Sequence, residues 1–245
     1  MPRLGMVIDL DKCYGCRACM VACKVENNTP EGHFWMYVFR LEEGEYPHTK
    51  VSFLPRPCMH CDNAPCVKVC PVGARFKEKN GLTVTDWDRC IGCRYCQVAC
   101  PYGVNYFNSK NPEERQYLDT QDDDLVAVTG GASPPYRNPD LDGRYGSERR
   151  HVAGAIHEKG VMTKCTFCIH RVEQGLLPAC AANCPVQAIL FGDLDDPTSS
   201  VSKLLAEKES FRLEEEFNTR PRVFYVGGSP PSADVRQIET VKART

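Results

Sequence analysis

The sequence predicts an α+β fold made of two tandem units, with a long insertion and a C-terminal extension. Three observations predict it. The 16 cysteines fall into four groups of four with closely related spacing. The element Cys-x-x-x-Cys-Pro recurs in three of the groups, which is the mark of an internal repeat. The segments between the groups carry short strand and hairpin patterns rather than long helical periodicity.

Short apolar runs bounded by turn residues predict most of the secondary structure. The expected strands cover residues 5–10, 34–41, 50–54, 74–77, 82–84, 188–191 and 222–226. Asn80-Gly81 lies between two of these strands and is a strong signal for a tight hairpin. Val201, Leu204 and Leu205 recur at helical spacing and predict a helix over residues 198–208.

Composition excludes several classes of protein. The chain has 245 residues, with 30 Lys and Arg against 32 Asp and Glu, so it lacks the basic field that general nucleic-acid binding needs. No apolar run approaches the roughly 18 residues of a membrane span, and residues 1–10 do not form a signal peptide. Only 42% of the residues are hydrophobic, cysteines included, so we expect something besides side-chain burial to hold the fold.

The cysteine spacing is the strongest signal. The first group is spaced C-x-x-C-x-x-C-x-x-x-C, and the third repeats this spacing and adds the proline that follows in bacterial ferredoxins. The second group lengthens one gap, and the fourth opens that gap to eleven residues. The four groups are Cys13, Cys16, Cys19 and Cys23; Cys58, Cys61, Cys66 and Cys70; Cys90, Cys93, Cys96 and Cys100; and Cys165, Cys168, Cys180 and Cys184.

This spacing has a physical reason. Three cysteines with two residues between neighbours form a loop around one face of an iron-sulfur cube. A fourth cysteine, after three more residues, starts a helical turn that leads away. The fourth thiolate therefore serves a neighbouring cluster, and the following proline redirects the chain. Each pair of groups makes one two-cluster, bacterial-ferredoxin-like unit, and the chain is predicted to hold four [4Fe-4S] clusters.

Two other uses of the cysteines are weighed against clusters. A disulfide framework suits small secreted domains, but it does not need one spacing repeated four times. Four zinc sites could also use 16 thiolates. The long C-x-x-C-x-x-C-x-x-x-C run followed by proline favours clusters over both.

The order of motifs resembles the four-cluster, ferredoxin-like electron-transfer subunit of the complex iron-sulfur molybdoenzymes, which include polysulfide, thiosulfate, tetrathionate, dimethyl sulfoxide and arsenate respiratory reductases. Lys24, in place of the first proline, fits that family. The insertion and the run Glu26-Asn27-Asn28-Thr29 look most like the arsenate branch. The resemblance spans nearly the whole chain and rests on residues 5–10, 22–28, 100–103, 164–168, 192–197 and 220–225.

The resemblance implies which cysteines share a cluster, because in such subunits the first group pairs with the fourth and the second with the third. No cysteine is missing, so four cubes are expected. The implied ligand sets are set A, Cys13, Cys16, Cys19 and Cys184; set B, Cys23, Cys165, Cys168 and Cys180; set C, Cys58, Cys61, Cys66 and Cys100; and set D, Cys70, Cys90, Cys93 and Cys96.

The same pairing divides the chain into parts. Residues 1–50 and 164–192 are expected to form an outer ferredoxin-like unit, and residues 51–103 an inner one. Residues 104–163 carry no cysteine and read as a surface insertion. Residues 193–245 are expected to form a C-terminal extension that contacts a partner.

The resemblance also implies a function. The chain would relay electrons between a catalytic subunit, which holds a molybdenum bis-pterin cofactor, and a quinone-binding membrane subunit or a cytochrome. No substrate site is visible in this chain. We expect the complex to lie on the periplasmic side of the membrane, exported with its catalytic subunit, with the cytoplasm as the alternative.

Two functions from other classes stay open. A free-standing polyferredoxin would keep the clusters but have little need for the insertion. A catalytic iron-sulfur enzyme would need an open iron or a second cofactor motif, and no Gly-x-Gly-x-x-Gly or phosphate loop is present. His60 is not expected to bind iron, because thiolates fill every set. The cations beside cysteines, which could raise cluster potentials, are Lys12, Arg17, Arg89, Arg94, Lys164, His170 and Arg171.

Overall fold

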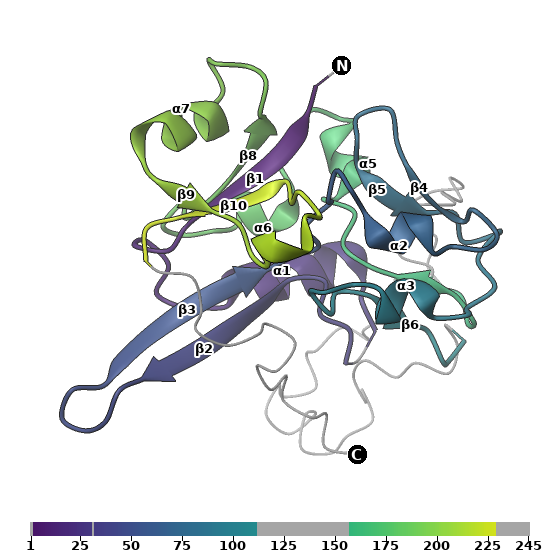
Figure 1. Cartoon of the computed structure of the whole chain (residues 1–245), viewed down its shortest axis with the longest axis horizontal. Coiled ribbons are helices and arrows are strands. Elements are labelled where there is room, and N and C mark those ends of the chain that lie inside the picture. The colour runs from purple at the N-terminus through teal and green to yellow at the C-terminus, as the bar shows by residue number, and fades with distance from the viewer. Residues whose placement is uncertain (1, 31, 112–156, 229–245) are drawn as a thin grey trace, which may run out of the picture.

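The computed structural model describes residues 2–30, 32–111 and 157–228. Most of the expected insertion (112–156) and the extension beyond residue 228 lie outside these residues. Figure 1 shows a sheet covered by a helix on the left, short helices and a hairpin on the right, and a longer helix, α1, between them.

The main sheet joins the two ends of the described chain. Its order is β8-β1-β10-β9, with β1 parallel to β10 and antiparallel to β8. All six residues of β1 are buried, as expected for a continuous apolar run in a central strand. The strands are β1 (Leu4–Asp9), β8 (Ile189–Asp193), β9 (Ser210–Phe211) and β10 (Val223–Val226).

The first part of the expected extension packs into this core. Helix α7 (Ser200–Glu207) begins after Ser199, whose hydroxyl accepts a hydrogen bond from the Ser202 N–H at 3.2 Å. The fully buried Val201 side chain packs with Val7 of β1 and Val226 of β10. The helix expected over 198–208 is confirmed, and it covers the sheet (Figure 1).

Three antiparallel pairs complete the strands of the described residues. Strands β2 (Tyr37–Glu43) and β3 (Lys50–Arg56) form an antiparallel hairpin that projects from the molecule in Figure 1. The hairpin expected around Asn80-Gly81 is confirmed as β4 (Arg75–Lys77) and β5 (Thr83–Thr85). The pair β6 (Tyr106–Phe107) and β7 (Met162–Thr163), like β9, was not predicted from the sequence.

The helices beside the cysteines differ in length. Three of them have four residues each and end two residues before a Cys-Pro pair: α2 (Pro65–Lys68), α3 (Tyr95–Val98) and α6 (Ala179–Ala182). A fourth short helix, α5 (Ile169–Val172), follows Cys168. Helix α1 (Ala18–Asn27) instead runs for ten residues and passes through Cys23.

Lys24 explains why α1 continues. A proline at this position would remove an N–H and clash with the preceding turn, as in any helix interior. The Lys24 ammonium instead donates to the carbonyl oxygens of Pro30, at 3.0 Å, and His33, at 3.1 Å. It therefore fixes the chain that follows the helix.

Candidate iron-sulfur sites

The loops of the first and third cysteine groups share the sequence Cys-x-Gly-Cys-Arg. Gly15 and Gly92 have φ of 76° and 65°. Arg17 and Arg94 both have φ of 63° and precede α1 and α3. These left-handed residues reverse the chain, so that successive thiols of each loop line one cavity.

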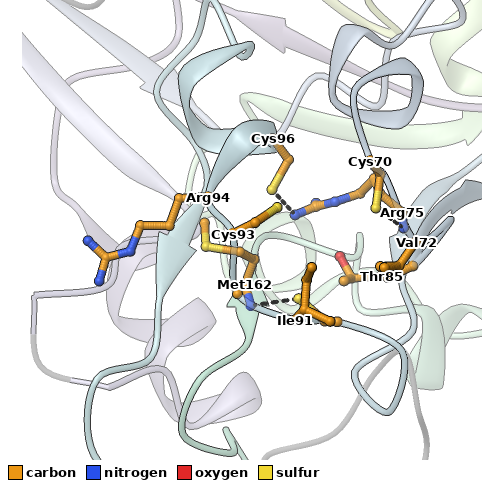
Figure 2. A pocket seen from close by; sticks show the side chains of 12 residues that line it. Cys70, Val72, Arg75, Thr85, Ile91, Cys93, Arg94, Cys96 and Met162 are labelled. Carbon is orange, nitrogen blue, oxygen red and sulfur yellow. Dashed lines mark hydrogen bonds between the residues drawn. The ribbon is translucent and has the colours of Figure 1, made fainter.

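Three cavities are each lined by four cysteines, and their volumes, including the opening to solvent, are about 310–340 Å³. Figure 2 shows the cavity of set D, with Cys70, Cys93 and Cys96 around it. The cysteines brought together are those of set A, Cys13, Cys16, Cys19 and Cys184; of set C, Cys58, Cys61, Cys66 and Cys100; and of set D, Cys70, Cys90, Cys93 and Cys96.

The cysteines of set B are buried together. Burial raises the pKa of Cys23 well above its ordinary value, and the neighbouring thiolates of Cys165 and Cys168 raise it further. Cys180 is likewise buried, and the pKa of its thiol is raised by burial and then by the thiolates of Cys168, Cys23 and Cys165. The Asn27 amide joins two of them, because it donates to Cys23 Sγ at 3.6 Å and to Cys168 Sγ at 3.5 Å.

Backbone N–H groups also point at cysteine sulfurs of sets A, B and D. Ala188 donates to Cys184 at 3.2 Å. Met162 donates to Cys90 at 3.4 Å, and Phe167 to Cys165 at the same distance. Such N–H···S contacts favour the thiolate form and tune an iron-sulfur centre.

The bare thiols resist ionisation. Burial, followed by the thiolates of Cys13, Cys184 and Cys16, raises the pKa of Cys19 to about 12. Burial, followed by the Cys58 thiolate, raises the pKa of Cys61 to about 12. Thiolates crowded in this way need cations among them, which iron supplies.

The arrangement of sets A, C and D suits a cluster with several irons. In the ranges that the structure describes, no three His, Cys, Asp or Glu side chains lie close enough together to hold one metal ion. The cysteines of sets A, C and D surround a cavity instead, as ligands of a cluster with several irons do. All 16 thiols are free of disulfides in the structure.

Comparison with known proteins agrees with this chemistry. Two family models, both described as a 4Fe-4S dicluster domain, match residues 12–74 in one case and residues 49–116 with 151–194 in the other. The chain therefore contains two ferredoxin-like dicluster domains, in a structure of mixed helices and strands.

Relatives match over almost the whole chain. The arsenate respiratory reductase iron-sulfur subunit of Shewanella sp. strain ANA-3 is 46% identical over 236 residues, which cover 91% of this chain and 96% of that protein. A putative dimethyl sulfoxide reductase iron-sulfur subunit of Halobacterium salinarum is 40% identical, with coverage of 93% and 80%. A tetrathionate reductase subunit of Salmonella typhimurium is 37% identical, with coverage of 92% and 72%.

The chain belongs to the iron-sulfur subunits of the molybdoenzyme reductases. This iron-sulfur subunit is an electron-transfer component of a reductase complex and not its catalytic subunit. Within the described parts of the chain, none of the helices has the length and apolar character needed to cross a bilayer.

The cations named from the sequence lie in different surroundings. In this iron-sulfur subunit Lys12, Arg17, Arg89 and Arg94 are exposed. His170 and Arg171 of α5 both bind Glu26 of α1, at 2.8 and 2.9 Å, which ties set B's two chain segments together. Lys164 is buried, lines the cavity of set C and donates to the Cys165 carbonyl at 2.9 Å.

Sequence reasoning missed Arg75. The cations named from the sequence lie within three residues of a cysteine, whereas Arg75 follows Cys70 by five residues. Its guanidinium nevertheless contacts a cysteine sulfur, Cys96 Sγ, at 3.3 Å (Figure 2). The internal repeat could have indicated Arg75, because residues 70–75 match residues 184–189 and Arg75 stands at the position of Ile189.

Proposed function

We propose that this subunit holds four [4Fe-4S] clusters, one in each of sets A to D, and relays electrons between a molybdopterin catalytic subunit and a membrane quinone-linked subunit or a cytochrome. The observation that carries the proposal is the gathering of four cysteines around each of three cavities, with the remaining four buried as a fourth group. A bound cluster supplies a centre that accepts and releases electrons.

Electrostatic interactions between the sets support a single row. Cys19 of set A acts electrostatically on Cys180 of set B, and Cys58 of set C acts on Cys165 of set B. Arg75 interacts with Cys96 of set D and with two thiolates of set C. The order along the row is therefore A, B, C, D.

The ends of the row lie near the surface. Cys16 of set A and Cys93 of set D are exposed, whereas every cysteine of set B is buried. Large apolar side chains are exposed beside both ends: Tyr14 next to set A, and Ile91 and Tyr95 next to set D. We propose that these ends face the two partners, since apolar and aromatic groups are enriched in interface cores.

The proposed substrate class of the complex is an arsenic oxyanion, with sulfur oxyanions as the alternative. The relative at 46% identity is named an arsenate respiratory reductase subunit, and the tetrathionate reductase subunit is 37% identical. We place the complex on the periplasmic side of the membrane, exported together with its catalytic subunit. Detection in the cytoplasmic fraction of the native host would contradict that location.

The first experiment is metal analysis of the complex, purified without oxygen from its native host. We expect about 16 irons on this chain, at four per cube, and molybdenum in a larger subunit that co-purifies. Stoichiometric zinc with little iron would contradict the electron-transfer role of the sets. Full iron without a molybdenum subunit would instead indicate a free-standing polyferredoxin.

A further inference from the structure

The inner unit carries cations where the outer unit carries apolar residues. The segment Cys70-Pro71-Val72-Gly73-Ala74-Arg75 matches Cys184-Pro185-Val186-Gln187-Ala188-Ile189 position by position. Arg75 and Ile189 are both buried, with 2% and 4% of their surface exposed. Two residues further on, Lys77 stands at the position of Phe191. Arg75 thus occupies a core position at which the matching copy of the repeat has an aliphatic side chain, Ile189.

Arg75 points into the cavity of set D (Figure 2). One guanidinium nitrogen, Nη2, donates to Cys96 Sγ at 3.3 Å, and the backbone N–H donates to Cys70 Sγ at 3.4 Å. Among the described residues, the other two guanidinium nitrogens, Nε and Nη1, have no hydrogen-bond partner. No carboxylate of these residues forms an ion pair with Arg75.

A buried cation without a carboxylate is costly unless other negative charge compensates it. Here the compensation comes from sulfur. The hydrogen bond from Nη2 places the guanidinium against Cys96 Sγ, and cysteine binds iron as the negatively charged thiolate.

We propose that Arg75 is a positioning residue that raises the reduction potential of the cluster held by set D. The inference rests on the proposed function, in which set D holds a [4Fe-4S] cluster. Reduction adds one negative charge to a site that is close to the buried guanidinium. A fixed positive charge there stabilises the reduced form more than the oxidised form, which raises the potential.

A second arginine near set D provides a comparison within the same site. Arg94 lines the same cavity, but its side chain is directed away from the cysteines (Figure 2). Its guanidinium lies over the Phe107 ring, 3.9 Å from the ring centroid, and the residue is exposed. Because the guanidinium is directed away from the sulfurs, its charge acts on set D less strongly than that of Arg75.

The test is a redox titration, followed by EPR, of the complex purified from its host. It compares the wild type with Arg75→Met, Arg75→Lys and Arg94→Met, and iron is counted in each. The signal of set D is identified as the one that Cys93→Ser removes. For Arg75→Met we expect the one-electron equilibrium of that signal to shift at least tenfold toward the oxidised form, which corresponds to about 59 mV. Arg75→Lys should stay within threefold of wild type, and Arg94→Met should shift the equilibrium less than Arg75→Met does.

The outcomes separate this inference from the proposed function. Zinc in place of iron in the wild type would overturn both. Full iron in Arg75→Met with an unchanged potential would overturn the role of Arg75 but leave the proposed function standing. If Arg75→Met loses iron, Arg75→Lys becomes the test of the charge. Full iron and a wild-type potential in Arg75→Lys support the role of the charge. A shifted potential or a loss of iron in Arg75→Lys overturns that role.

Discussion

His60 and Phe167 occupy the same position in two cysteine loops, and their rings stack with centroids 4.0 Å apart. Both residues have positive φ, 44° and 55°, where the other two loops have glycine. The Thr83 N–H donates to His60 Nδ1 at 3.1 Å, so Nε2 carries the hydrogen and donates to the Cys165 carbonyl at 3.0 Å. His60 therefore links the loop of set C to that of set B.

His60→Ala should leave iron binding intact but destabilise the fold. The change removes a fully buried ring and leaves the Thr83 N–H and the Cys165 carbonyl without their partner, at a cost of about 2–4 kcal/mol. Iron per chain and the unfolding temperature, measured without oxygen, check this. His48→Ala, at an exposed hairpin position, is the control and should change neither. Iron loss from His60→Ala in the folded complex would refute the assignment.

Gly92→Ala should destabilise the loop of set D far more than Gly73→Ala. Both glycines have φ near 65°, which costs any other residue about 1–2 kcal/mol. A Cβ on Gly92 would lie 2.2 Å from the Gly160 carbonyl oxygen, whereas one on Gly73 meets nothing within 4 Å. The clash adds a further 1–3 kcal/mol or so. Denaturant unfolding of the two variants measures the difference, and equal losses would contradict it.

The sequence predicted what depends on local pattern. Cysteine spacing indicated the cofactor, and apolar runs located β1, β8, β10 and the hairpin β4–β5 within a residue or two. Turn chemistry supported the last of these, because Asn80-Gly81 leaves few other conformations. Each of these signals lies within about ten residues of chain.

What the sequence missed depends on contacts between distant segments. Cys66 and Arg75 are close in the chain, but the contact of Arg75 with Cys96 joins residues 21 positions apart. His60 and Phe167 are more than a hundred positions apart, so no periodicity could pair them. The pairing of cysteine groups likewise came from the family resemblance and not from spacing, which is similar in all four groups.

Lys24→Pro should be much more damaging than Lys24→Met, although proline follows the last cysteine in the other three groups. Here α1 continues to Asn27, so a proline would break the helix at a cost of about 3 kcal/mol or more. Methionine keeps the helix but loses the hydrogen bonds of the ammonium to Thr29, Pro30 and His33, at a cost of about 1–3 kcal/mol. Helix content and unfolding temperature check the order, and a tolerated proline would show that α1 does not need its second half.

Cys93→Ser should remove the cluster of set D and stop electron delivery. Cys93 lines the cavity with Cys70, whose own group supplies three cysteines to set C, so the neighbouring signal should also change. We expect iron to fall by about 4 of 16 per chain and electron transfer from a donor to the catalytic subunit to cease. Gln97→Ala is the matched control, because this exposed residue of α3 follows Cys96 directly but does not line the cavity. A serine variant with full iron and normal electron delivery would mean that Cys93 binds no iron.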